Sequence, residues 1–166
     1  MTAPGAHEAA VLTVSTRAAA GLRHDTAGPA LVEALAAAGW DVAPEPIVLA
    51  DDEAAVAGAL SGLADGGYRL LVTTGGTGLS PTDRTPEATL SIADRLIPGL
   101  GELMRGAGMA STPMAALSRG LAAARGLTLI VNLPGSPTGA GESLAAVLPV
   151  LRHAVDQLAG GDHQKD

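Results

Sequence analysis

Hydrophobic positions in this chain fall into short continuous runs that are separated by polar or glycine-rich stretches. Runs of this length predict strands that are buried on both faces, as they are in a parallel sheet. They occupy residues 9–15, 40–49, 68–73, 118–124 and 127–132. Prolines interrupt the second run, so we expect a broken strand there. Arg125 and Gly126 separate the last two runs, which indicates a β-hairpin.

Between these runs, apolar residues recur at helical spacing. Helices are predicted over residues 29–38, from Asp51 or Asp52 to about Leu63, and over residues 142–158. A further helix is predicted from Thr85 onward. It breaks near Pro98 and Gly99 and resumes over residues 101–106. Gly39 ends the first helix in the position after its C-cap. Thr85 and Pro86 have the residue types of an N-cap and a first helical residue.

Strands that alternate with helices predict an α/β fold. We expect a three-layer αβα sandwich with a mainly parallel sheet, right-handed crossovers and a short β-hairpin near residues 118–132. At 166 residues the chain has the usual size of one domain. Residues 1–166 are therefore predicted to form a single domain, with residues 1–8 and 160–166 frayed.

Sites in such sheets form beyond the carboxyl ends of the parallel strands. Polar or glycine-rich segments follow several predicted strand ends, namely residues 15–17, Asp51, residues 75–83 and residues 132–136. Parallel strands bring their carboxyl ends to one edge of a sheet. The sequence therefore predicts that these segments share one rim.

Composition restricts the class of protein further. Hydrophobic residues make up 47% of the chain but aromatic residues only 1%, so the core must consist of Ala, Val, Leu and Ile. A net charge of −7 opposes binding to nucleic acid or to anionic membranes. The absence of cysteine excludes disulfides, thiolate metal ligands and a cysteine nucleophile. No apolar run approaches the roughly 20 residues of a membrane helix, and we expect a cytoplasmic protein.

The richest segment for chemistry is residues 71–89, which read LVTTGGTGLSPTDRTPEAT. Gly75, Gly76 and Gly78 permit backbone conformations and close approaches that a side chain would block. Such a turn can direct several N–H groups at one anion or carbonyl. The segment lacks the Gly-Lys-Ser/Thr of a P-loop and the third glycine of the dinucleotide fingerprint. A purely steric role for the glycines in a tight turn remains an alternative.

Motifs along most of the chain carry a family resemblance. They are TTGGTG at residues 73–78, Asp83, TPEA at residues 85–88, the amino-terminal segment 11–35, and the segment 116–144 with ALSRGL and NLPGSP. In these segments the chain resembles the MogA/MoaB family of molybdenum-cofactor biosynthesis, the molybdopterin adenylyltransferases. The matching segments occur in the family's order.

The resemblance implies an enzyme that transfers an adenylyl group from ATP to molybdopterin and releases pyrophosphate, with Mg²⁺ as cofactor. It also implies a homotrimer. The alternatives are a MoaB-like protein that binds or carries molybdopterin with little turnover, and a scaffold for assembly. Neither nucleic acid nor a membrane is an expected partner.

The resemblance assigns catalysis and metal binding to Asp51 and Asp83, with Asp52 as the alternative to Asp51. Two carboxylates beside a polyanionic substrate make sense only if they hold a divalent cation. Simpler roles stay open at this stage. Asp51 or Asp25 can cap a helix, and Asp83 can be a solvated turn residue.

The remaining site residues are assigned to substrate binding. They are Ser15, Asp25, Gly75, Gly76, Thr77, Gly78, Ser118, Arg119, Asn132, Pro134, Gly135 and Ser136. In the family, the loop at residues 132–136 lines the pterin pocket, and Arg119 is our candidate clamp for a phosphate or carboxylate. Thr16, Thr82 and Thr138 stand where many relatives carry a charge, and Arg84 is a candidate substitute for the arginine missing at position 82. The histidines have no ligand-like spacing.

Overall fold

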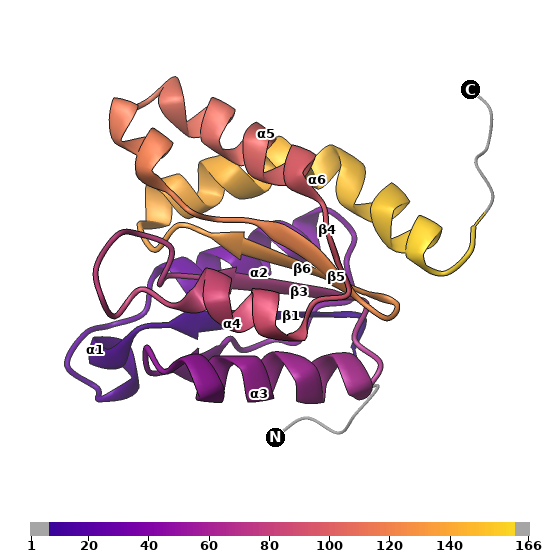
Figure 1. Cartoon of the computed structure of the whole chain (residues 1–166), viewed down its shortest axis with the longest axis horizontal. Helices are drawn as coiled ribbons and strands as arrows, with labels where there is room; N and C mark the ends of the chain where they lie inside the picture. Colours follow the sequence, from indigo (N-terminus) through magenta and orange to yellow (C-terminus); the bar gives the residue numbers. More distant parts are fainter. Residues whose placement is uncertain (1–6, 162–166) are drawn as a thin grey trace.

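The computed structural model describes residues 7–161, and the strands in this range form one mixed sheet (Figure 1). They are β1 (Ala9–Val14), β2 (Ile47–Leu49), β3 (Leu70–Thr74), β4 (Arg95–Leu96), β5 (Ala122–Arg125) and β6 (Thr128–Leu133). Their order across the sheet is β2-β1-β3-β6-β5-β4. The pairs β2–β1, β1–β3 and β3–β6 are parallel, whereas β5 is antiparallel to both β6 and β4. The predicted mainly parallel α/β fold is confirmed.

Helices cover both faces of this sheet, as the layers in Figure 1 show. They are α1 (Thr16–Ala19), α2 (Ala27–Ala37), α3 (Glu53–Asp65), α4 (Thr85–Ile92), α5 (Pro98–Met109), the 3-10 helix η1 (Pro113–Leu117) and α6 (Pro137–Leu158). Helices α2, α5 and α6 contribute to one hydrophobic core, and α3 and α4 contribute to the other.

The two cores explain the unbroken apolar runs in the sequence. In β1, Ala9 and Val11 belong to the core under α2, α5 and α6. Ala10, Leu12 and Val14 belong to the core under α3 and α4. Successive side chains of a strand point to opposite faces, and here both faces are covered. Most residues of the central strands are therefore apolar, and the buried polar exceptions include Thr13, Thr73 and Asn132.

The predicted strand over residues 40–49 is wrong for most of its length. Only Ile47–Leu49 forms a strand, because Pro44 and Pro46 cannot donate a hydrogen bond to a neighbouring strand. Trp40 is nevertheless buried in the core, where its ring stacks against the guanidinium of Arg152. The apolar signal therefore marked a packed segment that pairs with β1 only through a single parallel bridge between Val42 and Ala9.

Three helix boundaries also differ from the prediction. Thr85 is not the N-cap of α4, because Arg84 occupies that position. The next break lies before Pro98, which begins α5, since proline is well suited to a first helical turn. Helix α6 begins at Pro137, because the Ser136 side chain accepts a hydrogen bond from Gly139 N at 3.1 Å and caps the helix there.

The hairpin of β5 and β6 is confirmed, although its first arm begins at Ala122 rather than at residue 118. The short elements α1, β4 and η1 were not predicted, since two to five residues carry too little periodicity.

The predicted frayed ends fall largely on residues 1–6 and 162–166, which lie outside the described residues. Within the described range, the Glu8 carbonyl accepts a hydrogen bond from Arg69 N at 2.8 Å, and Gly160 N donates to Gln157 O at 3.0 Å. Hydrogen bonding thus reaches farther toward both ends than expected. Across residues 7–161, none of the helices has the length and apolar character to span a membrane.

We predict that Leu144→Ala lowers the free energy of unfolding by about 2–5 kcal/mol, because Leu144 is fully buried where α6 packs on the sheet. Denaturant unfolding followed by circular dichroism measures the change. Leu22→Ala is the matched control, since the Leu22 side chain is 80% exposed and its loss should change stability by less than about 0.5 kcal/mol. Equal losses in both variants would contradict the assigned core.

Candidate functional site

The parallel strands end side by side at one edge of the sheet. Val14 of β1 pairs with Leu49 of β2, and Thr74 of β3 pairs with Leu133 of β6. The segments that follow these four strands therefore lie next to one another. This placement confirms the predicted common rim, and two clefts open along it.

One cleft, of about 360 Å³, has the more polar lining of the two and is called the polar cleft here. Its lining includes eight of the predicted site residues, namely Ser15, Asp25, Asp51, Gly75, Gly76, Asp83, Gly135 and Ser136. Thr13, Arg23 and His24 line it as well. Asp51 and Asp83 thus come to one cavity although they follow different strands.

Asp51 and its neighbour Asp52 have different roles. Asp52 is the N-cap of α3, and its Oδ1 accepts a hydrogen bond from Ala55 N at 2.7 Å. Asp51 is not the cap. Its Oδ2 accepts hydrogen bonds from Thr16 N and Thr16 Oγ1, both at 2.8 Å. Thr16 therefore orients the Asp51 side chain through its backbone N–H and its hydroxyl, and an ionised aspartate at position 16 would keep only the backbone donor.

Asp83 lies at the far end of the glycine-rich turn and folds back over it. Its Oδ2 accepts a hydrogen bond from Ser80 N at 3.0 Å. The same oxygen would lie 2.7 Å from a Cβ added at Gly78. The glycine at this position therefore makes room for the carboxylate.

Asp25 stabilises the start of α2 and the end of β1. Its Oδ1 accepts a hydrogen bond from Gly28 N at 3.0 Å, and its Oδ2 accepts one from Thr13 Oγ1 at 2.7 Å. The capping alternative is thus correct for its side chain, even though Thr26 holds the formal N-cap position. Both oxygens are used by the protein, although the residue still lines the polar cleft.

The donor set of the polar cleft fits Mg²⁺ bound mainly by its substrate. Among residues 7–161, no group of three or more His, Asp or Glu side chains converges on a metal-sized site. Asp51 and Asp83 are two carboxylates, and Mg²⁺ commonly takes one or two protein carboxylates with substrate phosphates and water. The two residues would hold the ion, and phosphates would complete its shell.

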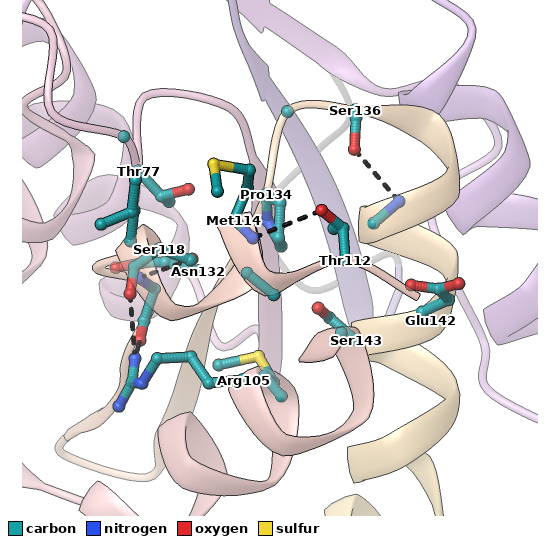
Figure 2. A pocket seen from close by; sticks show the side chains of 18 residues that line it. Thr77, Arg105, Thr112, Met114, Ser118, Asn132, Pro134, Ser136, Glu142 and Ser143 are labelled. Carbon is teal, nitrogen blue, oxygen red and sulfur yellow. Dashed lines mark hydrogen bonds between the residues drawn. The ribbon is translucent and has the colours of Figure 1, made fainter. Parts of the chain in front are cut away.

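The second cleft, of about 300 Å³, is mainly apolar and is called the apolar cleft (Figure 2). The predicted site residues in its lining are Thr77, Gly78, Ser118, Asn132, Pro134, Gly135 and Ser136. Met104, Met114 and Leu117 contribute apolar surface. Because Gly135 and Ser136 line both clefts, the two cavities share a wall.

Three polar side chains stand out in the apolar cleft. Arg105 Nη1 donates to the carbonyl of Gly120 at 2.8 Å. Glu142 accepts a hydrogen bond from Ser111 Oγ. Asn132 is fully buried, and its Nδ2 donates to Thr73 Oγ1 at 3.0 Å, whereas its Oδ1 has no partner. A ligand with ring N–H donors suits a cleft with such acceptors.

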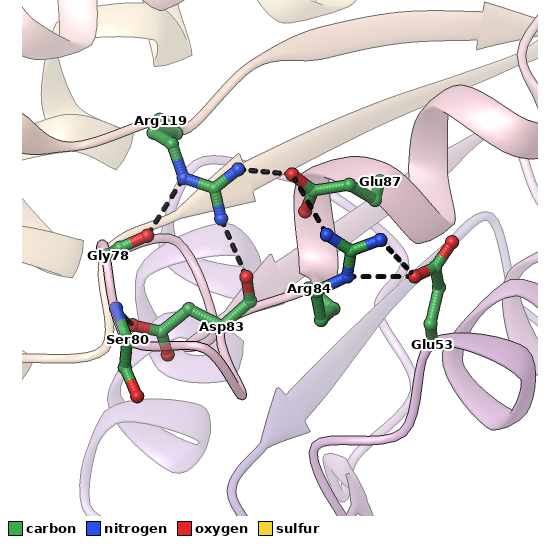
Figure 3. Close-up of polar contacts among 7 residues, drawn as sticks. All are labelled: Glu53, Gly78, Ser80, Asp83, Arg84, Glu87 and Arg119. Atoms are coloured by element: carbon green, nitrogen blue, oxygen red, sulfur yellow. Dashed lines mark hydrogen bonds and ion pairs between the residues drawn. The ribbon is translucent and has the colours of Figure 1, made fainter.

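Arg119 and Arg84 line neither of these clefts. Arg119 donates to the carbonyls of Gly78 and Asp83 and to the Glu87 carboxylate. Arg84 pairs with Glu53 at 2.7 Å and approaches Glu87 (Figure 3). The hydrogen bond from Arg119 lowers the pKa of Glu87, and the hydrogen bond to Glu53 raises the pKa of Arg84. Arg84 thus does not take the place of an arginine at position 82.

Sequence reasoning missed several residues of the apolar cleft, including Arg105, Met114, Glu142 and Ser143. Met114 lies in a 3-10 helix too short to give a periodic signal. A signal did exist for Glu142 and Ser143. The sequence Ser136-Pro137 has the residue types of an N-cap and first helical residue, and a helix that starts there places residues 142 and 143 within two turns of the rim.

Two adjoining clefts at the carboxyl edge of the sheet are typical of the α/β domains that have a small-molecule site at this rim. The family model for the probable molybdopterin binding domain matches residues 10–153. The chain belongs to this family.

Relatives agree with that assignment. The molybdopterin adenylyltransferase of Helicobacter pylori is 38% identical over 157 residues, which cover 90% of this chain and 86% of the relative. The Escherichia coli molybdopterin adenylyltransferase is 40% identical over 139 residues, covering 82% and 71%. The crystal structure of the molybdopterin biosynthesis enzyme MoaB from Thermus thermophilus superposes on this chain with a TM-score of 0.86 and 52% sequence identity. The match covers 93% of this chain and 97% of the MoaB chain. The resemblance inferred from the motifs is confirmed.

We predict that Gly76→Ala lowers the free energy of unfolding by about 1–3 kcal/mol, because Gly76 has φ +66° and an added Cβ would overlap Thr85 Oγ1. Urea unfolding measures the loss. Gly58→Ala is the control, because an added Cβ there meets no atom within 4 Å on the exposed face of α3, and it should raise stability by about 0.5–1 kcal/mol. A neutral Gly76→Ala variant would contradict the strained turn.

A second prediction concerns acid stability. The folded-state pKa of Glu87 is lowered from its usual 4.5. The contribution of the ionised Glu87 to folding stability is therefore complete above pH 4.5, and it is lost as the pH falls through the lower folded-state pKa. Below pH 4.5, wild type should therefore lose more stability than Glu87→Gln, which has no such carboxylate. Urea midpoints measured across this range test the difference, with the exposed Glu33→Gln as the charge control. Parallel profiles for wild type and Glu87→Gln would refute it.

Proposed function

We propose that this chain is a molybdopterin adenylyltransferase that transfers an adenylyl group from ATP to molybdopterin and releases pyrophosphate. The observation that carries the proposal is the shared rim. Asp51, Asp83 and the glycine turn line a polar cleft, and Gly135 and Ser136 connect it to an apolar cleft. The related adenylyltransferases support the activity, since they match this chain over 82–90% of its length.

The reaction brings two anionic groups together in an acidic protein. An oxygen of the molybdopterin phosphate attacks the α-phosphorus of ATP, a new P–O bond forms, and the bond to the β-phosphate oxygen breaks as pyrophosphate leaves. Such transfers depend mainly on position and on charge stabilisation, so no protein nucleophile is required. Mg²⁺, held by Asp51 and Asp83, supplies positive charge for the phosphate oxygens when bound.

The protein's own groups contribute positive potential at the same place. The Gly75 N–H donates to Leu133 O, so the donors that we assign to the rim are the N–H groups of residues 76–78 and the amino end of α6 at Ser136. Partial positive charge at helix starts and glycine turns attracts phosphate without any net charge on a side chain. This arrangement suits a chain whose net charge is −7.

The apolar cleft has the character of a site for a flat heterocycle, and both substrates carry one. The sulfur and methylene surface of Met104 and Met114 suits a ring face, and the Glu142 carboxylate offers an acceptor for ring N–H groups. A homotrimer and a cytoplasmic location, which the resemblance also implies, are part of this proposal. So is the assignment of the other lining residues to substrate binding.

We predict that Asp83→Asn reduces pyrophosphate release from Mg·ATP and molybdopterin by at least about 100-fold, since loss of one metal ligand removes several kcal/mol of charge stabilisation. Equilibrium binding of molybdopterin should change little, because the substituted side chain keeps its shape. A coupled pyrophosphate assay and fluorescence titration measure the two quantities. Asp156→Asn, an exposed change near the carboxyl end of α6, is the matched control.

The outcomes separate the proposal from its alternative. Unchanged turnover in Asp83→Asn would refute the metal role of Asp83. If wild type binds molybdopterin but never forms the AMP adduct under saturating Mg·ATP, the chain is a binding or carrier protein, and the neutral residues Thr82 and Thr138 become the first candidates for the loss of activity.

A further inference from the structure

The loop that carries Asp83 has few backbone hydrogen bonds of its own. It runs from the end of β3 to the start of α4. Within it, Asp83 N donates to Ser80 O at 2.9 Å, and Thr85 N closes its base by donating to Gly76 O at 3.1 Å. A side chain that must hold a metal ion needs firmer support, because small displacements of a ligand weaken binding.

That support comes from Arg119, which lies far away in the sequence, between η1 and β5. Its Nε donates to Gly78 O at 2.8 Å, and its Nη2 donates to Asp83 O at 2.6 Å. Its backbone N also donates to Thr77 O at 2.8 Å. One planar guanidinium thereby connects the two limbs of the loop, as Figure 3 shows.

Gly78 lies between Arg119 and the Asp83 carboxylate. Asp83 Oδ2 would lie 2.7 Å from a Cβ at Gly78, whose own carbonyl accepts the Arg119 Nε–H. Gly78 therefore borders the space that the Asp83 carboxylate occupies. Arg119 fixes both the backbone of Asp83 and the surface on which its carboxylate rests.

Charged side chains extend this support to the other acidic residue. Glu87 accepts a hydrogen bond from Arg119 Nη1 and lies 3.9 Å from Arg84 Nη1. Arg84 in turn donates its Nε–H to Glu53 Oε2 at 2.9 Å. Arg84 directly follows Asp83, and Glu53 begins α3 two residues after Asp51. The chain Glu53–Arg84–Glu87–Arg119 therefore joins the backbone beside one acid to the backbone beside the other.

We propose that Arg119 is a positioning residue that, through this network, sets the place of Asp83 relative to Asp51 in the polar cleft. The inference rests on the proposed function of these two carboxylates. In this proposal Arg119 does not clamp a substrate phosphate directly, as the sequence suggested, but acts indirectly through the position of Asp83. All three guanidinium nitrogens of Arg119 already have protein acceptors, whereas its neighbours Ser118 and Gly120 line the apolar cleft.

The first test measures metal binding directly. In Arg119→Gln, the affinity for Mn²⁺ in the presence of a non-hydrolysable ATP analogue, measured by electron paramagnetic resonance, should fall about 10–100-fold. Arg119→Lys should recover only part of the loss, because an ammonium lacks the planar fork that spans two carbonyls. Mn²⁺ affinity equal to wild type in Arg119→Gln would overturn the proposal.

Arg69→Gln is the matched control. Arg69 also bridges two carbonyls, with Nε 3.3 Å from Leu127 O and Nη2 3.2 Å from Val155 O, but at the opposite end of the sheet. It should lose a similar amount of stability and keep wild-type Mn²⁺ affinity. If Mn²⁺ affinity falls equally in both variants, Arg119 acts only through general stability and the proposal fails.

The second test separates positioning from substrate contact. Molybdopterin affinity is compared between Asp83→Asn and the double variant Asp83→Asn/Arg119→Gln by fluorescence titration. Equal affinities support an action through Asp83, whereas about 10-fold weaker binding in the double variant would show that Arg119 contacts the ligand. Failure of wild type to form the AMP adduct would refute the proposed function alone, since the Mn²⁺ comparison still decides the role of Arg119.

Discussion

The site depends on backbone segments that approach one another more closely than side chains would permit. A Cβ at Gly75 would overlap the carbonyl of Val14, and one at Gly135 would lie 3.2 Å from the Cα of Gly75. The ends of β1, β3 and β6 therefore meet with only main-chain atoms between them. This contact places the glycine turn, the loop after β6 and the first residues after β1 around one cavity. Larger residues here would separate the carboxylates from the N–H groups that share their cleft.

Charge in this acidic chain is distributed so that the rim can accept anions. Arg119 donates to the carbonyls of Gly78 and Asp83, and the exposed Arg84 pairs with Glu53, so neither arginine lines the two clefts. In the proposed function, positive potential at the rim comes instead from backbone amides and a helix start, which lose no conformational freedom when a ligand binds. The exposed Arg84–Glu53 pair adds little to folding stability, since solvent screens it. Its geometric effect on two neighbouring loops is the more important one.

The sequence predicted the sheet and the rim well because both depend on local signals. Runs such as residues 9–15 and 68–73 are apolar on both faces, and the polar segments after them mark the strand ends. It could not separate Asp51 from Asp52, since both suit a helix start, and only the folded structure shows that Asp51 lines the polar cleft while Asp52 caps α3. Arg119 illustrates a second limit. Its partners lie 36 and 41 residues away, and no local pattern reveals them. Apolar cleft residues such as Arg105 and Met114 come together only through tertiary packing.

The wall formed by Gly135 and Ser136 has a thermodynamic consequence. Because these two residues border both cavities, a ligand that displaces them from one side alters the shape presented on the other. If a ligand in one cleft changes the dissociation constant of a ligand in the other cleft by some factor, the second ligand changes the dissociation constant of the first by the same factor. For any two ligands that occupy the two clefts, their mutual effect on affinity is then one coupling free energy that this short loop would transmit.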